Sequence, residues 1–70
     1  MIEKTKSDPR LLIKSWLELN ERSIRWLSEK TGIERSHLYR VIIERSRPLT
    51  LKSLDKINEV LETSYYMNNA

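Results

Sequence analysis

Two arginines, Arg35 and Arg40, stand five residues apart in a polar stretch, and both have the chemistry to bind nucleic-acid bases. A guanidinium presents paired N–H donors that match the O6 and N7 acceptors of guanine, and such a contact favours the right base by about 1–3 kcal/mol. Five residues of α-helix span about 500°, so the two side chains would lie about 140° apart, and a groove that wraps around the helix could contact both. Ser36, His37 and Tyr39 lie beside them and can contact a base or a phosphate. The alternative for Tyr39 is packing as a half-buried aromatic, and for His37 it is simple exposure to solvent.

Positive charge is concentrated around these arginines. Residues 22–52 contain eight Lys or Arg and three Glu, an excess of five positive charges, whereas the rest of the chain has an excess of two negative charges. A phosphate-binding surface requires such a concentration, although a solvated helical surface is the alternative. Ser23 adds a hydroxyl and backbone N–H groups at the start of a predicted helix, where anions bind. We therefore predict phosphate contacts from Arg22, Ser23, Arg25, Arg45 and Arg47.

Helices must position these side chains. Asp8 and Pro9 predict the start of a first helix, because Asp caps a helix well and Pro suits the first helical position. Ser23 predicts the cap of a second helix that ends near Thr31. The apolar side of the first helix follows at helical spacing in Leu12, Ile13, Trp16, Leu17 and Leu19.

A turn and two further helices follow. Gly32, the only glycine, predicts a tight turn with positive φ. A third helix is expected from Glu34 or Arg35 to about Glu44, and Thr50 predicts the cap of a last helix. The apolar side of that last helix comprises Leu51, Leu54, Ile57, Val60 and Leu61. No strand pattern is present, so we predict an all-α fold, a small bundle of about four to five helices.

The stretch Ser23–Ile33, with Leu38 and the run Arg40–Ile42, resembles the phage-repressor or Cro-like (XRE-type) helix-turn-helix family. Residues 47–57 resemble the helix that follows the motif in that family, with its proline, its cap and its Leu-x-x-Leu-x-x-Ile spacing. The likeness covers roughly residues 10–62. It implies a lambda-repressor-like bundle in which the helix around residues 35–44 enters the major groove of DNA, with Arg35, Ser36 and Arg40 facing the bases. We predict base contacts from Arg35, Ser36, His37, Tyr39 and Arg40.

The sequence departs from the family pattern in several places. Glu34 stands where the family usually has a Ser, Thr or Asp cap, so Ser36 is an alternative start for the third helix. Arg45 and Ser46 stand where the family often has a glycine, which leaves the connection to the last helix open. Trp26 occupies a position that is usually polar and exposed, and it could cover the core, meet a partner or lie near DNA.

Composition narrows the class of protein further. Seventy residues with 39% hydrophobic content suit one small globular domain. The chain has no cysteine, which excludes disulfides and cysteine-ligated zinc fingers, and its one histidine cannot form a metal site alone. It has no catalytic constellation or cofactor-binding loop, so we expect no enzymatic activity, no cofactor and no metal. No apolar run reaches the length of a membrane span and no signal peptide is evident, so we expect a cytoplasmic protein.

These observations favour a sequence-specific double-stranded DNA-binding transcriptional regulator, most simply a dimeric repressor of phage or mobile-element type on a palindromic operator. We expect a flexible N-terminal tail at 1–8, the DNA-binding domain at 9–62, and a C-terminal tail at 63–70 that could form a dimer. The candidates for a dimer surface are Trp26, Tyr65, Tyr66 and Met67. Control would come from concentration, proteolysis or a regulatory protein partner, because no ligand domain is present. Two alternatives stay open: a protein-interaction module of antitoxin or antirepressor type, and an excisionase-like architectural DNA binder.

Overall fold

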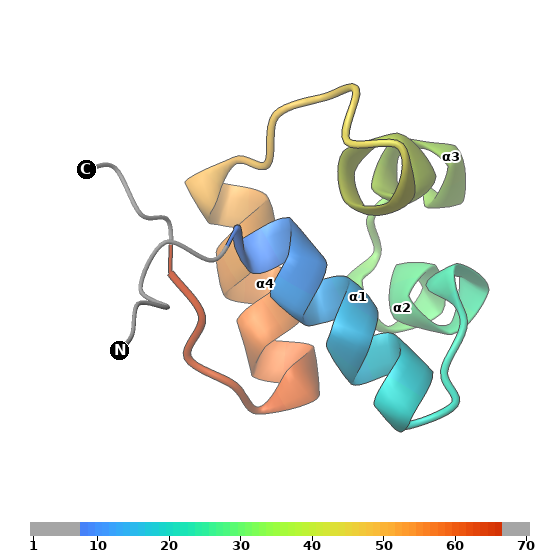
Figure 1. Cartoon of the computed structure of the whole chain (residues 1–70), viewed down its shortest axis with the longest axis vertical. Coiled ribbons are helices and arrows are strands. Elements are labelled where there is room, and N and C mark those ends of the chain that lie inside the picture. The colour runs from blue at the N-terminus through green and yellow to red at the C-terminus, as the bar shows by residue number, and fades with distance from the viewer. Residues whose placement is uncertain (1–7, 67–70) are drawn as a thin grey trace.

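The chain folds into four α-helices and one π-helical turn, as seen in a computed structural model that describes residues 8–66 (Figure 1). No strand occurs within these residues, so the all-α prediction is confirmed. The predicted tail before Asp8 and the last four residues, Met67 included, lie outside the described residues. The elements in chain order are α1 (Pro9–Leu19), α2 (Ile24–Thr31), α3 (Arg35–Leu38), η2 (Tyr39–Ile43) and α4 (Leu51–Leu61).

Three of the helices start where the sequence predicts, because a capping side chain fixes each start. Asp8, Ser23 and Thr50 precede α1, α2 and α4, and each accepts a hydrogen bond from a backbone N–H of the first turn, at 2.9–3.2 Å. Such bonds satisfy N–H groups that have no partner inside the helix. Gly32 ends α2 with φ of 80°, a left-handed conformation that glycine adopts without strain, as predicted.

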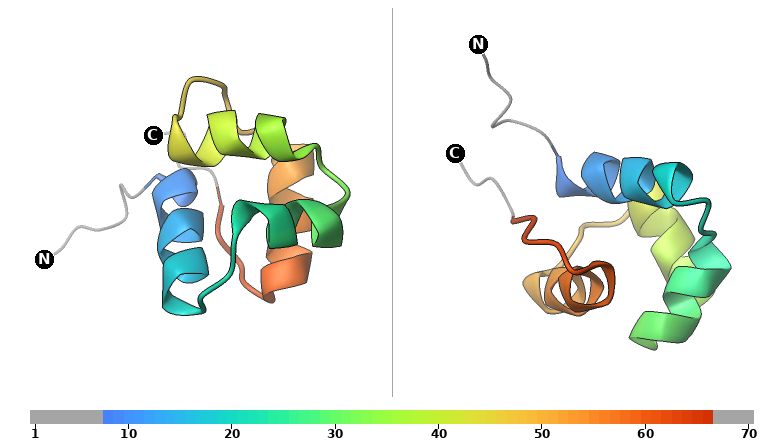
Figure 2. Two further views of the ribbon diagram at one scale, coloured as in Figure 1. Left: turned by 90° about the vertical axis from the view of Figure 1, so that its right-hand side faces the viewer. Right: turned by 90° about the horizontal axis from the view of Figure 1, so that it is seen from below.

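The core consists of aliphatic side chains from every helix and from the loop before α4. Helix α1 packs against η2, while α2 packs against both α3 and α4. The α3–η2 helix runs across one end of the molecule, and the loop that follows it lies along the same edge (Figure 2). The buried side chains are Ile13, Leu17, Leu27, Leu38, Val41, Ile42, Leu49, Leu54, Ile57 and Leu61.

Two predicted core positions are wrong. Leu19 is 84% exposed and Leu51 is 65% exposed, although both are in phase with the apolar side of their helices. Leu19 is the last residue of α1 and Leu51 the first residue of α4. Helical periodicity gives the direction of a side chain but not whether a neighbouring helix extends far enough to cover it.

The two tryptophans join α1 to α2. The rings of Trp16 and Trp26 stack with their centroids 5.9 Å apart and an angle of 17° between their planes. The guanidinium of Arg22 lies over the Trp26 ring, 5.0 Å from its centroid. Both rings are partly buried and pack against the core. Of the three roles left open for Trp26, the structure therefore supports covering the core.

The third predicted helix has the expected extent, but its second half is not α-helical. The Glu44 N–H donates to the Tyr39 carbonyl at 3.1 Å, a bond across five residues that defines the wider π turn. The turn coincides with three consecutive β-branched residues, Val41–Ile43, which all contact the core, and β-branched side chains are crowded in an α-helix. At its start, Glu34 makes no side-chain cap bond. The helix nevertheless begins at Arg35, so the alternative of a later start is wrong.

The segment after α4 is fastened by one amide. The Asn58 Nδ2 donates to the Tyr65 carbonyl at 2.7 Å, while its Oδ1 accepts bonds from the Thr63 hydroxyl at 2.8 Å and from the Tyr65 N–H at 3.1 Å. Tyr65 packs partly buried against the core, whereas Tyr66 is exposed. Of these two candidate dimer residues, Tyr66 therefore presents the larger free surface.

Candidate nucleic-acid interface

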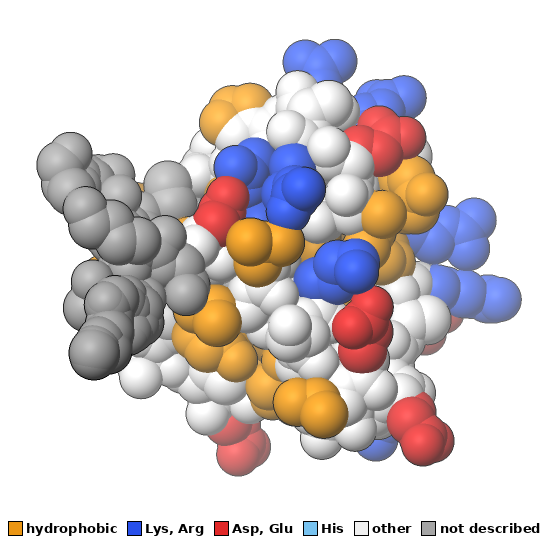
Figure 3. Space-filling model, viewed as in Figure 1, with side chains coloured by type: hydrophobic (Ala, Val, Ile, Leu, Met, Phe, Trp, Pro, Cys, Tyr) orange, Lys and Arg blue, Asp and Glu red, His pale blue; other side chains and the backbone are white. Residues whose placement is uncertain are grey.

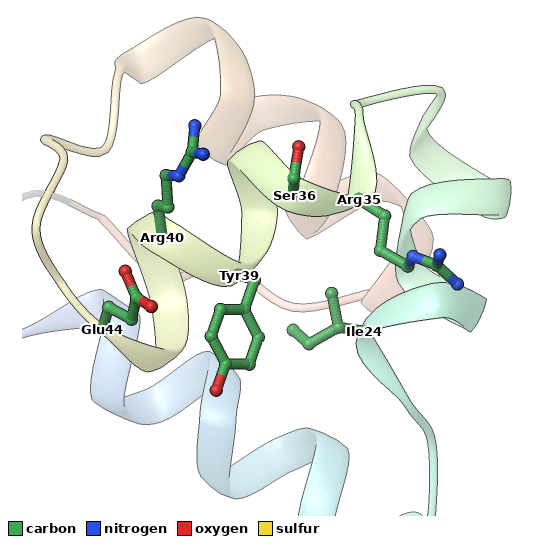
Figure 4. Close-up of a pocket in the computed structure, with 6 residues that line it drawn as sticks. All are labelled: Ile24, Arg35, Ser36, Tyr39, Arg40 and Glu44. Atoms are coloured by element: carbon green, nitrogen blue, oxygen red, sulfur yellow. The ribbon is translucent and has the colours of Figure 1, made fainter.

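A shallow groove brings together four of the five side chains predicted to contact bases. It has a volume of about 380 Å³ and lies on the outer side of the α3–η2 helix, where this helix meets the start of α2 (Figure 4). Arg35, Ser36, Tyr39 and Arg40 all line it. His37, the fifth residue, is partly buried and lies outside the groove.

Two further lining residues were not predicted. Ile24 and Glu44 also face the groove, where Ile24 provides an apolar wall opposite Tyr39 and Glu44 provides a carboxylate (Figure 4). Ile24 is only partly buried, so part of its side chain is available to the groove. Glu44 follows Arg40 by four residues and Ser36 by eight, so the α-helical spacing of the sequence was the signal that could have placed it there.

The two arginines of the groove point to different ends of it. Arg35 extends toward α2, and Arg40 extends from the opposite end of the helix, while Ser36 and Tyr39 lie between them (Figure 4). Tyr39 is 47% exposed, so its ring forms part of the groove and is not simply packed away. The groove therefore offers hydrogen-bond donors at both ends and apolar surface in the middle. Base edges in a DNA major groove present the matching acceptors and, at thymine, a methyl group.

The predicted phosphate contacts flank this groove in two groups. Ser23, Arg22 and Arg25 lie at or near the start of α2, and Arg45 and Arg47 lie in the loop between η2 and α4. The Ser23 oxygen accepts a bond as the cap, which leaves its O–H free to donate. Arg25 is exposed and lies 3.4 Å from Glu29, so its charge is partly offset.

The remaining arginines of this surface have no such partner. Arg35, Arg40, Arg45 and Arg47 are exposed, and no carboxylate of residues 8–66 lies within 4.0 Å of their guanidinium groups. Lys and Arg side chains gather along the upper and right-hand edges of the molecule, over α2, α3 and the loop (Figure 3). Uncompensated cations on one surface create a potential that attracts polyanions.

No metal site accompanies the groove, since no three His, Asp or Glu side chains of residues 8–66 come together. Within the same residues, no helix has the length and apolar character needed to cross a membrane. Comparison with protein-family models, with curated proteins and with solved structures found no match to this chain.

Proposed function

We propose that this protein is a sequence-specific double-stranded DNA-binding regulator that inserts the α3–η2 helix into the major groove. In this proposal α2, the Gly32 turn and the α3–η2 helix act as a helix-turn-helix. Arg35, Ser36, Tyr39 and Arg40 contact base edges, while the arginines that flank the groove contact phosphates. A second copy bound to the other half of a palindromic operator would increase both affinity and specificity.

The observation that carries the proposal is that the groove lies beside four exposed arginines, Arg35, Arg40, Arg45 and Arg47, which have no carboxylate of residues 8–66 within 4.0 Å. The groove supplies donors in an arrangement suited to base edges, and the flanking cations Arg45 and Arg47 supply attraction that is independent of sequence. The resemblance of residues 23–42 to the phage-repressor family gives independent support, because it points to the same helix. A repressor of phage or mobile-element type, acting in the cytoplasm, is the biological role that this resemblance favours.

The proposal is tested by fluorescence anisotropy with two labelled duplexes. One duplex is selected from a random pool by repeated binding to the protein, and the other is its scrambled counterpart. Binding of the selected duplex should be at least about tenfold tighter. If the four flanking arginines, Arg22, Arg25, Arg45 and Arg47, contact phosphates, affinity should fall by about two orders of magnitude between about 50 mM and about 200 mM salt.

Single-residue variants identify the contacting helix. Arg40→Ala should weaken binding to the selected duplex by about 1–3 kcal/mol and relax the preference at one base pair. Lys56→Ala is the matched control, since it removes one exposed positive charge from α4. If Arg40→Ala and Lys56→Ala weaken binding to the selected duplex equally, Arg40 does not contact a base. Equal, salt-sensitive binding of both duplexes would favour an architectural DNA binder, and no binding at low salt would favour a protein-interaction module.

A further inference from the structure

An ion pair at the start of α1 holds one guanidinium in a fixed orientation. The Arg10 Nε donates to both carboxylate oxygens of Asp8, at 3.1 and 3.0 Å, and Nη2 donates to Oδ2 at 2.6 Å. The two side chains are only 24% and 31% exposed. The Arg10 hydrogen bonds hold the pKa of Asp8 below its ordinary value, with a smaller contribution from the charge of Arg45. Asp8 is therefore ionised at neutral pH, and its carboxylate fixes the plane of the Arg10 guanidinium.

The remaining nitrogen of the Arg10 guanidinium, Nη1, contacts the loop between η2 and α4. The Arg10 Nη1 donates to the backbone carbonyl of Arg47 at 3.2 Å, across 37 residues of sequence. Every other side-chain hydrogen bond within residues 8–66 joins positions at most seven residues apart. This bond therefore connects the first turn of the protein directly to the loop that carries Arg45 and Arg47.

The loop has few other attachments. The Ser46 N–H donates to the Arg40 carbonyl at 2.9 Å, and the Leu49 side chain is buried in the core. Between these two points, within the described residues, Arg10 makes the one hydrogen bond to the loop backbone. Arg45 and Arg47 repel each other and also repel Arg10. Without the Arg10 hydrogen bond, the loop would therefore move in the direction that separates these charges. Asp8 offsets this repulsion because it brings a negative charge to the cluster.

We propose that Arg10, oriented by Asp8, is a positioning residue that holds the loop so that Arg45 and Arg47 face the DNA backbone. This inference rests on the proposed DNA binding and extends it to a pair of residues on a different helix. Lysine cannot replace Arg10 in this role, because a single ammonium group cannot match a carboxylate and a carbonyl along two edges of one plane. The role therefore depends on geometry rather than on the charge of Arg10.

Asp8→Asn separates geometry from charge, because the two predict opposite results. Asparagine keeps the helix cap, so the variant should fold. It also makes the protein more positive by one charge, which by electrostatics alone tightens binding to DNA. Loss of positioning should instead weaken binding to a random-sequence duplex by about twofold to threefold at low salt and reduce the salt slope by about one contact.

Glu18→Gln on α1 is the matched control, since it adds the same charge at an exposed position that does not touch the loop, and it should bind as tightly as the original chain or more tightly.

Combining Asp8→Asn with the loss of Arg45 and Arg47 tests whether Asp8 acts on DNA binding through these two arginines. A merely structural role predicts the same effect of Asp8→Asn with or without them. In a chain with Arg45→Ala and Arg47→Ala, the loop carbonyl remains but its charges are gone, so Asp8→Asn should no longer weaken DNA binding. Arg10→Lys should behave like Asp8→Asn, and circular dichroism melting confirms that each variant is folded at the temperature used. If Asp8→Asn tightens binding as Glu18→Gln does, the positioning role is wrong and the DNA-binding proposal stands. If the original chain binds no duplex at low salt, the DNA-binding proposal itself fails, and this inference fails with it.

Discussion

Replacing Arg45 by glycine should raise the free energy of unfolding of the protein and weaken its binding to DNA. Arg45 has φ of 56°, in the left-handed region, which costs a residue with a Cβ about 1–2 kcal/mol. Glycine avoids this cost but gives the unfolded chain more freedom, which offsets about 0.4–1 kcal/mol. The net expectation is a gain of about 0.5–1 kcal/mol in the free energy of unfolding, or about 2–8 °C in Tm for a domain of this size.

Two controls separate the backbone from the side chain. Arg45→Ala removes the same guanidinium but keeps the Cβ, so the difference between the Gly and Ala variants measures the cost of the left-handed conformation less the chain freedom that glycine adds to the unfolded state. Glu62 has φ of 57° at the end of α4, so Glu62→Gly should give a similar gain in stability without weakening DNA binding. Thermal unfolding followed by far-ultraviolet circular dichroism gives the stabilities. Anisotropy with a random duplex should show the salt slope reduced by about one contact for both Arg45 variants.

An Arg45→Gly variant no more stable than Arg45→Ala would mean that the left-handed backbone costs no more there than the chain freedom that glycine adds to the unfolded state. A Gly variant that binds DNA as tightly as the original chain would remove Arg45 from the interface, whatever its stability. Thermal unfolding and DNA binding are measured separately, so the expected gain in stability and the expected loss of binding can each fail without the other.

Further predictions concern the turn, the C-terminal segment and acid stability. Gly32→Ala should lower the free energy of unfolding in urea by about 0.5–1 kcal/mol, the cost of the left-handed φ less the freedom that the unfolded chain loses, because no atom lies within 4 Å of the added Cβ. Asn58→Ala removes the three hydrogen bonds to Thr63 and Tyr65, so it should cost about 1–3 kcal/mol and speed amide exchange after α4 more than in α1. Folding holds the pKa of Asp8 below its ordinary value of 3.8, so the stability that this carboxylate contributes is present above that pH and is lost as the pH falls through the lower, folded-state pKa. Asp8→Asn should reduce this acid dependence in urea titrations at a series of pH values, and an unchanged acid limb would contradict the assignment.

Local signals made much of the fold predictable. The capping residues Asp8, Ser23 and Thr50 and the glycine at position 32 were identified from sequence, because each acts within a few residues of itself. Four of the five proposed base-contacting residues line one groove, because they were predicted on one short helix and that helix is present. Helical spacing is enough to group side chains when all of them belong to one element.

Features that depend on distant segments were not predictable in this way. The exposure of Leu19 and Leu51 depends on how far neighbouring helices extend. The bond from Arg10 to the Arg47 carbonyl joins segments whose approach is fixed only by the whole fold. The π turn after Leu38 was not predicted, because an apolar pattern with α-helical period does not encode a bond across five residues.

Two departures from ideal helical structure lie on the helix that carries the proposed base contacts. Glu34 makes no side-chain cap bond and η2 is a π turn, whereas left-handed backbone occurs at three separate places, Glu21, Arg45 and Glu62. In contrast, α1, α2 and α4 all begin with a side-chain cap. Wider helical turns and strained backbone occur often at functional sites, where surrounding structure maintains them. A helix with a side-chain cap at its start and glycine at position 45 would be more stable here, but it would lack the Arg45 guanidinium. The missing cap and the wider turn of this helix therefore agree with its proposed role in binding, and the well-capped helices around it hold it in place.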